Sequence, residues 1–173
     1  MATCAIVAGY VIGCRDSIGG IDAVYIAEAG NVTLVDASGT ITGITKATGK
    51  KYFKFEVPTK STATATSEGT ASTENGTLFF EQTVELPINK RDATTRNIVT
   101  TLSKNKVSII TLDKDGVYRA YGKANGLYLD STGGMTGAAA GDKNGYTLKF
   151  SGTEPEDFFV VINAVGLALE TTG

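Results

Sequence analysis

Apolar and polar side chains alternate along two runs in the middle of the chain, residues 51–58 (KYFKFEVP) and 77–88 (TLFFEQTVELPI). In the first run the apolar face consists of Phe53, Phe55 and Val57. In the second run it consists of Leu78, Phe80, Val84 and Leu86. A period of two is typical of strands with one buried face, so both runs are predicted to be half-buried strands.

The segment between these runs, residues 59–75, is rich in Thr, Ser, Ala and Gly and has no aromatic or large aliphatic side chain. Such a segment has little to bury against a core. It is therefore predicted to project from the fold as a long β-hairpin loop, or to be mobile, and to contact another molecule.

Other short runs rich in Val, Ile, Thr and aromatic residues predict a mainly β fold. These strands are expected at residues 21–28, 31–35, 40–45, 106–112, 117–123, 127–130, 146–150 and 158–162. The first three are closely spaced, which favours a meander. Residues 131–144, which are mostly Gly, Ala, Ser and Thr, predict a second long surface loop.

One amphipathic helix is predicted at residues 91–104. Asp92 is a suitable N-cap, Ile98 and Leu102 are four residues apart on one face, and Asn105 is a suitable left-handed stop.

The length and composition indicate one domain. The chain has 173 residues, of which 42% are hydrophobic and 20% charged, which is typical of a globular protein. We expect an N-terminal arm at residues 1–20, a single β-rich domain at 21–165 and a C-terminal tail at 166–173. No apolar run approaches the ~20 residues that a membrane-spanning helix needs, so no membrane anchor is expected.

Charge and residue types argue against several functions. The 16 basic and 18 acidic residues give a formal charge of -2, so phosphate neutralisation along a nucleic acid is not expected. The chain has no His, which removes the commonest general base and metal ligand. We therefore expect neither an enzyme nor a site for a metal or cofactor.

Two motifs resemble ligand sites but fit turns better. Asp113 and Asp115 precede Gly116 as in the first half of a calcium loop, yet Val117 and Ala124 stand where further oxygen ligands are needed. A hairpin turn is the favoured interpretation. The glycines between residues 133 and 141 match no phosphate-binding loop, because no Lys follows them at the required spacing, and they too are interpreted as turn residues.

Carboxylates and tyrosines are also candidate binding groups. Two acid sets could in principle serve glycoside hydrolysis, Glu81 with Glu85 and the cluster Glu154, Glu156 and Asp157, but both are interpreted as solvated side chains. The positions of Tyr118 and Tyr121 differ by an odd number, so their side chains face opposite sides of a strand. These two tyrosines and Tyr128 are therefore expected to pack against other residues and not to form a platform on which bases or sugars stack.

The two cysteines, Cys4 and Cys14, are close in sequence and describe no disulfide framework. We expect free, partly buried thiols in a reducing compartment. Residues 11–14 (VIGC) have the residue types of a lipoprotein cleavage box, but residues 1–10 contain no Lys or Arg, which argues against a signal peptide.

The order of elements resembles that of the tail tube proteins of tailed bacteriophages. The segments ENGTLFFEQTVELPINK, RDATTRNIVTTLSKNK and AGDKNGYTLKFSG also resemble phage virion proteins of this type. The resemblance covers residues 15–162. It implies a β-sandwich or split β-barrel with one flanking α-helix, assembled as hexameric rings that stack into a hollow tube.

In such a tube the hairpin loop would contact the adjacent subunit or the next ring. The residues that the resemblance assigns to this self-assembly loop are Thr59, Lys60, Ser61, Thr62, Thr64, Thr66, Glu68, Thr70, Thr73 and Asn75. A second contact is expected from apolar residues of the N-terminal arm, namely Ile6, Val7, Tyr10, Val11 and Ile12.

A lumen that conducts DNA should be neutral or acidic so that phosphate does not adhere, and Glu81 and Glu85 are candidates to line it. The expected partners are other copies of the chain and other virion tail proteins, while DNA passes without specific binding. The protein would be made in the host bacterial cytoplasm and reside in the virion. Alternatives are another β-rich virion component, such as a capsid decoration or head-to-tail joining protein, and an enzyme or carbohydrate-binding module.

Overall fold

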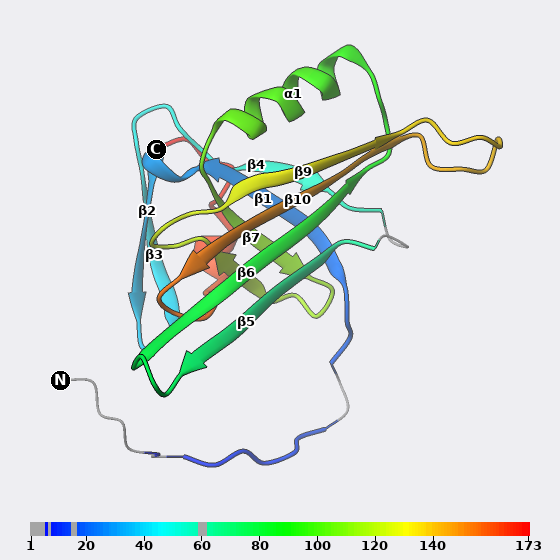
Figure 1. Ribbon diagram of the computed structural model, residues 1–173. Coiled ribbons are helices and arrows are strands. Elements are labelled where there is room, and N and C mark those ends of the chain that lie inside the picture. Colours follow the sequence, from blue (N-terminus) through cyan, green and yellow to red (C-terminus); the bar gives the residue numbers. More distant parts are fainter. Residues whose placement is uncertain (1–5, 7, 15–16, 59–61) are drawn as a thin grey trace.

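The computed structural model describes residues 6, 8–14, 17–58 and 62–173, and it is mainly β with two sheets (Figure 1). The seven-stranded sheet has the order β2 (Val32–Ala37), β3 (Thr40–Lys46), β11 (Phe159–Val161), β8 (Tyr118–Tyr121), β7 (Val107–Asp113), β1 (Ile21–Glu28) and β4 (Phe53–Glu56). The four-stranded sheet has the order β5 (Thr64–Ser72), β6 (Thr77–Ile88), β10 (Gly145–Glu154) and β9 (Tyr128–Met135). Every pairing is antiparallel except that of β11 with β3.

The two sheets pack face to face around one apolar core, which makes the fold a β-sandwich. The seven-stranded sheet contributes Val24, Ile26, Ile109 and Tyr121, and the four-stranded sheet contributes Val84, Leu86, Leu148 and Phe150. The fold class predicted from the sequence, mainly β with a flanking helix, is confirmed.

The flanking helix, α1 (Ala93–Lys104), lies at the top of the sandwich in Figure 1 and closes the core with Val99 and Leu102. Its N-cap is Asp92, whose Oδ1 accepts the N–H of Thr95 at 2.7 Å. This confirms the predicted cap. The left-handed stop at Asn105 is wrong, because its φ is -115° and the chain continues directly into β7 in an extended conformation.

A second core covers the opposite face of the seven-stranded sheet. Tyr52 and Leu169 are fully buried there, and the N–H of Tyr52 donates to the Leu169 carbonyl at 3.1 Å. A short helix, α2 (Asn163–Leu167), leads into this segment. The expected C-terminal tail, residues 166–173, therefore packs on the sheet. Tyr118 lies in this second core and Tyr121 in the first, so the predicted opposite orientation of the two tyrosines is confirmed.

Most predicted strands are present, but the predicted meander is wrong at its first step. β2 and β3 form a hairpin, whereas β1 pairs with β4 and β7. A 3-10 turn, η1 (Ala29–Asn31), redirects the chain between β1 and β2. The 113–116 turn does connect β7 and β8 as a hairpin, with the N–H of Gly116 donating to the Asp113 carbonyl at 2.9 Å.

The predicted alternation in residues 51–58 is wrong at its start. Tyr52 is fully buried, while Phe53 is 60% exposed and Phe55 is half-buried. The reason is that β4 is the edge of a sheet with a core on each face. Tyr52 lies just before the strand and packs into the second core, where its hydroxyl is 3.1 Å from the Ser108 hydroxyl. Leu78 is likewise 59% exposed, because the start of β6 extends beyond the core.

Two segments predicted as loops are largely strand. Residues 64–72 form β5, and Ala63 and Ala65 pack against the first core, so the projecting loop is wrong for this part of residues 59–75. Small alanines suffice here because the larger side chains of β6 fill the core beside them. In residues 131–144, the part up to Met135 belongs to β9 and pairs with β10. Only residues 136–144 extend beyond the sandwich as an exposed loop (Figure 1).

Candidate assembly surface

The outward face of the four-stranded sheet is covered with hydroxyl and carboxylate side chains. Cross-strand pairing places Thr64, Thr66, Glu68, Thr70 and Ser72 of β5 on the same face as Glu85, Thr83, Glu81, Phe79 and Thr77 of β6. Lys149, Ser151 and Thr153 of β10 continue the same rows. The predicted loop residues 64, 66, 68 and 70 and the predicted lumen residues Glu81 and Glu85 are thus brought together on one surface, which we call the hydroxyl face.

The remaining predicted loop residues lie near the ends of β5. Thr73 and Asn75 belong to the turn that joins β5 to β6, and the N–H of Asn75 donates to the Ser72 hydroxyl at 3.3 Å. Thr62 is exposed just before the strand. Thr59, Lys60 and Ser61 lie outside the described residues.

The charge of the hydroxyl face is acidic. Four carboxylates project from its strands, those of Glu68, Glu81, Glu85 and Asp130, and Lys149 is the single cation that the strands set against them. Asp130 is held on this face because the Ser151 hydroxyl donates to its carboxylate. Glu68 and Glu81 are directly opposite each other, an arrangement that destabilises a strand pair. This surface repels anions such as phosphate.

Both edges of the four-stranded sheet are open. β5 and β9 are its outer strands, with nine and eight residues, and neither contains Lys or Pro. Natural edge strands are usually kept short or are protected by Lys, Pro or a covering element, because their free N–H and C=O groups pair readily with another chain. The β5 edge therefore has no such protection, whereas β9 contacts α1 and has a register shift in its pairing with β10.

The described part of the N-terminal arm lies away from the sandwich (Figure 1). Ile6, Tyr10, Val11 and Ile12 are between 84% and 96% exposed. Val7 lies outside the described residues. A cluster of large apolar side chains with this exposure indicates a contact surface. Cys14 is a free and exposed thiol, so the expected partial burial is wrong for it, and Cys4 lies outside the described residues.

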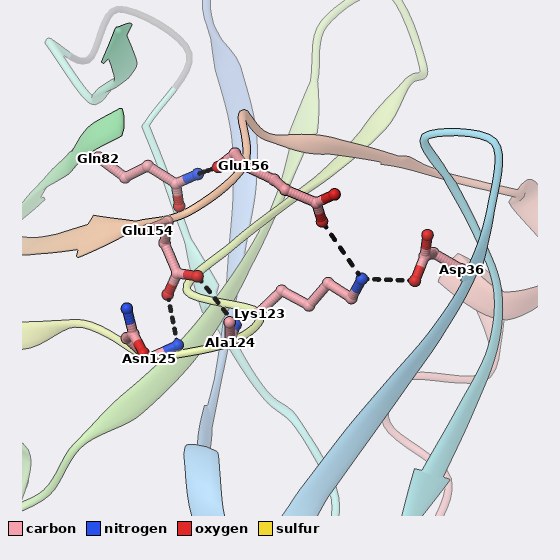
Figure 2. A network of polar contacts seen from close by, with 7 residues as sticks. All are labelled: Asp36, Gln82, Lys123, Ala124, Asn125, Glu154 and Glu156. Atoms are coloured by element: carbon pink, nitrogen blue, oxygen red, sulfur yellow. Dashed lines mark hydrogen bonds and ion pairs between the residues drawn. The ribbon is translucent and has the colours of Figure 1, made fainter. Parts of the chain in front are cut away.

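A polar network joins the two sheets near the end of β10 (Figure 2). The Glu154 carboxylate is 3% exposed and accepts the backbone N–H groups of Ala124, Asn125 and Gly126 at 2.9, 2.8 and 2.9 Å. These three residues lie in the middle of the connection from β8 in one sheet to β9 in the other. Glu154 was expected to be solvated, and that expectation is wrong, because the loop folds over the carboxylate and satisfies it.

The network extends from Glu154 to Lys123 and Gln82. Lys123 forms ion pairs with Asp36 and with Glu156, the latter at 3.8 Å, and its Nζ lies 4.2 Å from the centroid of the Phe159 ring. The buried Gln82 accepts the N–H of Gly122 at 2.8 Å and donates to the Glu156 carbonyl at 3.3 Å. Figure 2 shows Glu154 directed at the loop and Glu156 directed at Lys123. These acids act as structural anchors of the inter-sheet connection.

Asp113 and Asp115, the acids of the calcium-like turn, face Arg119. Arg119 forms ion pairs with both carboxylates, and the pair with Asp115 has a separation of 3.8 Å. Among the described residues, no group of three or more His, Cys, Asp or Glu side chains is placed to hold a metal ion. In the same part of the chain no helix is both long and apolar enough to cross a membrane.

The sequence gives no simple signal for the open edges or for the buried role of Glu154. An acid at a strand end is usually solvated, and an edge strand has the same residue pattern as any half-buried strand. Both features depend on which strands become neighbours. Comparison with known proteins adds no assignment, since no family model matches the chain and no curated protein sequence matches it.

Proposed function

We propose that this chain is a structural virion protein that assembles into stacked hexameric rings, forming the tail tube of a bacteriophage through which DNA passes. The observation that carries the proposal is the four-stranded sheet, which combines two open edges with an acidic face of hydroxyl and carboxylate side chains. The resemblance of three sequence segments to phage virion proteins of the tail-tube type also supports it.

In the proposed assembly, the ring closes through the two edges of the four-stranded sheet. β5 of one copy pairs with β9 of the next, so that the four-stranded sheets of six copies form one continuous barrel. Head-to-tail contacts of this type close into a ring when the rotation between copies allows it. Closure removes every free edge of the sheet and so removes the aggregation hazard that these edges present in a single copy.

The hydroxyl face lines the lumen in this arrangement. Its carboxylates, among them Glu81 and Glu85, repel the phosphates of the passing DNA, and its hydroxyl groups remain hydrated. The opposite face of the sheet is buried in the core of the sandwich. The apolar N-terminal arm supplies a second contact between copies and buries its exposed side chains there.

The edges also separate this function from the alternatives. A capsid decoration protein does not need two polymerising edges, and a glycoside hydrolase or carbohydrate-binding module needs a concave site, whereas the hydroxyl face belongs to an open sheet.

The proposal is tested by measuring self-association of the purified full chain. We expect stacked rings or hollow tubes in negative-stain electron microscopy at high protein concentration, with a matching rise in mass by light scattering. A second measurement uses Ser67→Pro and Glu68→Pro in β5. Adjacent residues of a strand point their N–H groups to opposite sides, so one proline disrupts pairing with β6 and the other removes a donor from the open edge.

The informative variant is the one that keeps the circular dichroism spectrum and melting behaviour of the wild type. This variant is expected to be folded but unable to form rings. Rings formed equally well by this variant would contradict closure through β5, and a wild-type chain that stays monomeric at every concentration and salt level would contradict the proposed function.

A further inference from the structure

The two ends of the four-stranded sheet carry opposite charge. At one end, where β6 leads into α1, a pocket of 380 Å³ is lined by Arg91, Arg96, Tyr146, Asn144 and Thr136, together with Asp92 and Ala93. The Arg91 guanidinium lies over the Tyr146 ring, 5.4 Å from its centroid. This packing places a planar cation at the wall of the pocket, and a guanidinium can bind a carboxylate through two parallel N–H donors.

The arginines of this pocket lack an acidic partner in their own chain. Among the ion pairs of the described residues, none involves Arg91 or Arg96. The acid in the pocket wall, Asp92, is already engaged, because its Oδ1 accepts the N–H of Thr95 and its Oδ2 is 3.2 Å from the Lys90 ammonium. Hydrogen bonds from Thr95 and Lys90 lower the pKa of Asp92 to about 2, so Asp92 is an anion whose charge is already compensated within its own chain. The pocket keeps two positive charges for an outside anion.

The other end of the sheet has the opposite surplus. Glu74 is exposed in the turn that joins β5 to β6, and Glu68 and Glu81 face each other a few residues from that turn. The described residues place no Lys or Arg within ion-pair distance of these three carboxylates. Like charges directly opposite on paired strands are unfavourable, and a cation from outside the chain would relieve them.

These two surfaces cannot meet within one molecule. β6 runs from the acidic turn to the arginine pocket, and its 12 residues span about 40 Å at ~3.3 Å per residue. Figure 1 shows the β5–β6 turn and the start of α1 at opposite ends of the sheet. A contact between them joins two copies head to tail, and a head-to-tail contact along one axis repeats without limit.

We propose that the arginine pocket of one copy binds Glu74 in the β5–β6 turn and Glu68 of the adjoining strand β5, in a second copy stacked on its end. The contact is distinct from edge pairing of β5 with β9, which acts sideways within a ring. This inference rests on the proposed tube. In it, stacked rings are held together by ion pairs, whereas neighbouring copies within a ring are held together by backbone hydrogen bonds. The two contacts therefore respond differently to salt, since ions at 1 M screen charges beyond about 3 Å.

A charge exchange between two variants tests the pairing. Arg91→Glu/Arg96→Glu makes both ends of the sheet acidic, and Glu68→Arg/Glu74→Arg makes both ends basic. Each variant alone should form single rings without stacks, while an equimolar mixture should recover stacks, because each acidic end then meets a basic one. Lys54→Glu/Lys104→Glu changes the net charge by the same amount as Arg91→Glu/Arg96→Glu but away from both ends, and it should stack as the wild type does. Sedimentation velocity and electron microscopy measure ring and stack populations, with folding checked by circular dichroism.

The outcomes separate the axial contact from the proposed function. Stacks that dissolve into rings at 1 M salt and reappear in the mixture support the contact. Stacking by either variant alone, or a mixture that gives only rings, overturns the contact and leaves the ring standing. A wild-type chain that forms neither rings nor stacks overturns both. Binding of a fluorescent DNA duplex that is lost in Arg91→Glu/Arg96→Glu, without any loss of stacking, would assign the pocket to phosphate and also overturn the contact.

Discussion

Replacing Glu154 by Gln should destabilise the fold by about 2 to 3 kcal/mol, which can be worked out from the three bonds that its carboxylate accepts. One oxygen accepts the N–H groups of Asn125 and Gly126, and the other accepts that of Ala124. Gln keeps one acceptor oxygen and turns an NH₂ group toward the N–H of Ala124. One bond to a charged group is lost, worth about 1.5 to 3 kcal/mol, and the other two weaken on loss of the charge. Relief of a buried charge offsets part of the sum.

The assay is urea unfolding at pH 7 followed by far-ultraviolet circular dichroism, because the chain has no Trp. The matched control is Glu156→Gln, two residues along the same segment. Glu156 is exposed, and its ion pair with Lys123 has a separation of 3.8 Å, so this change should cost less than about 1 kcal/mol. The reasoning is refuted if Glu154→Gln stays within about 0.5 kcal/mol of the wild type, the usual range of surface substitutions. An equal loss in both variants would also refute it.

Three further predictions concern the lumen and two titrating groups. Glu81→Lys with Glu85→Lys should slow DNA ejection from particles, since the lumen would then attract phosphate, and unchanged ejection kinetics would count against a lumenal position. Burial raises the pKa of Tyr52 to about 12 from 10.0, so the contribution of its neutral hydroxyl to stability is complete below pH 10 and is lost between about pH 10 and 12. The free energy of unfolding in urea should therefore depend less on pH in Tyr52→Phe than in the wild type across this range. Identical pH profiles for the two proteins would contradict this prediction. The hydrogen bond from the Thr95 N–H at the start of α1 is the main cause that lowers the pKa of Asp92 to about 2 from 3.8. The stabilising effect of the Asp92 carboxylate is therefore present above pH 4 and is lost as the pH falls to 2. Asp92→Ala should melt at a lower temperature than the wild type at pH 7 and approach it near pH 2, and an unchanged melting temperature at pH 7 would contradict the cap.

Local patterns of the sequence determined the features that depend on neighbouring residues. The N-cap of α1 at Asp92, the hairpin turn at 113–116 and the opposite orientation of Tyr118 and Tyr121 each require only a few consecutive side chains. The period of two in β6 correctly identified Val84 and Leu86 as core residues for the same reason. Glu81 and Glu85 follow from this alternation as outward residues.

Only the tertiary structure decided which strands pair and what each face meets. Tyr52 is buried and Phe53 exposed because β4 ends up at the edge of a sheet with two cores, and β5 is a strand because β6 lies beside it. Glu154 is buried because a loop some 30 residues away in sequence donates to it. The opposite charges at the two ends of the four-stranded sheet likewise arise from residues gathered from β5, β6, α1 and the β9–β10 loop. Such features depend on burial and hydrogen bonding between distant segments, and these act only once the whole chain has packed.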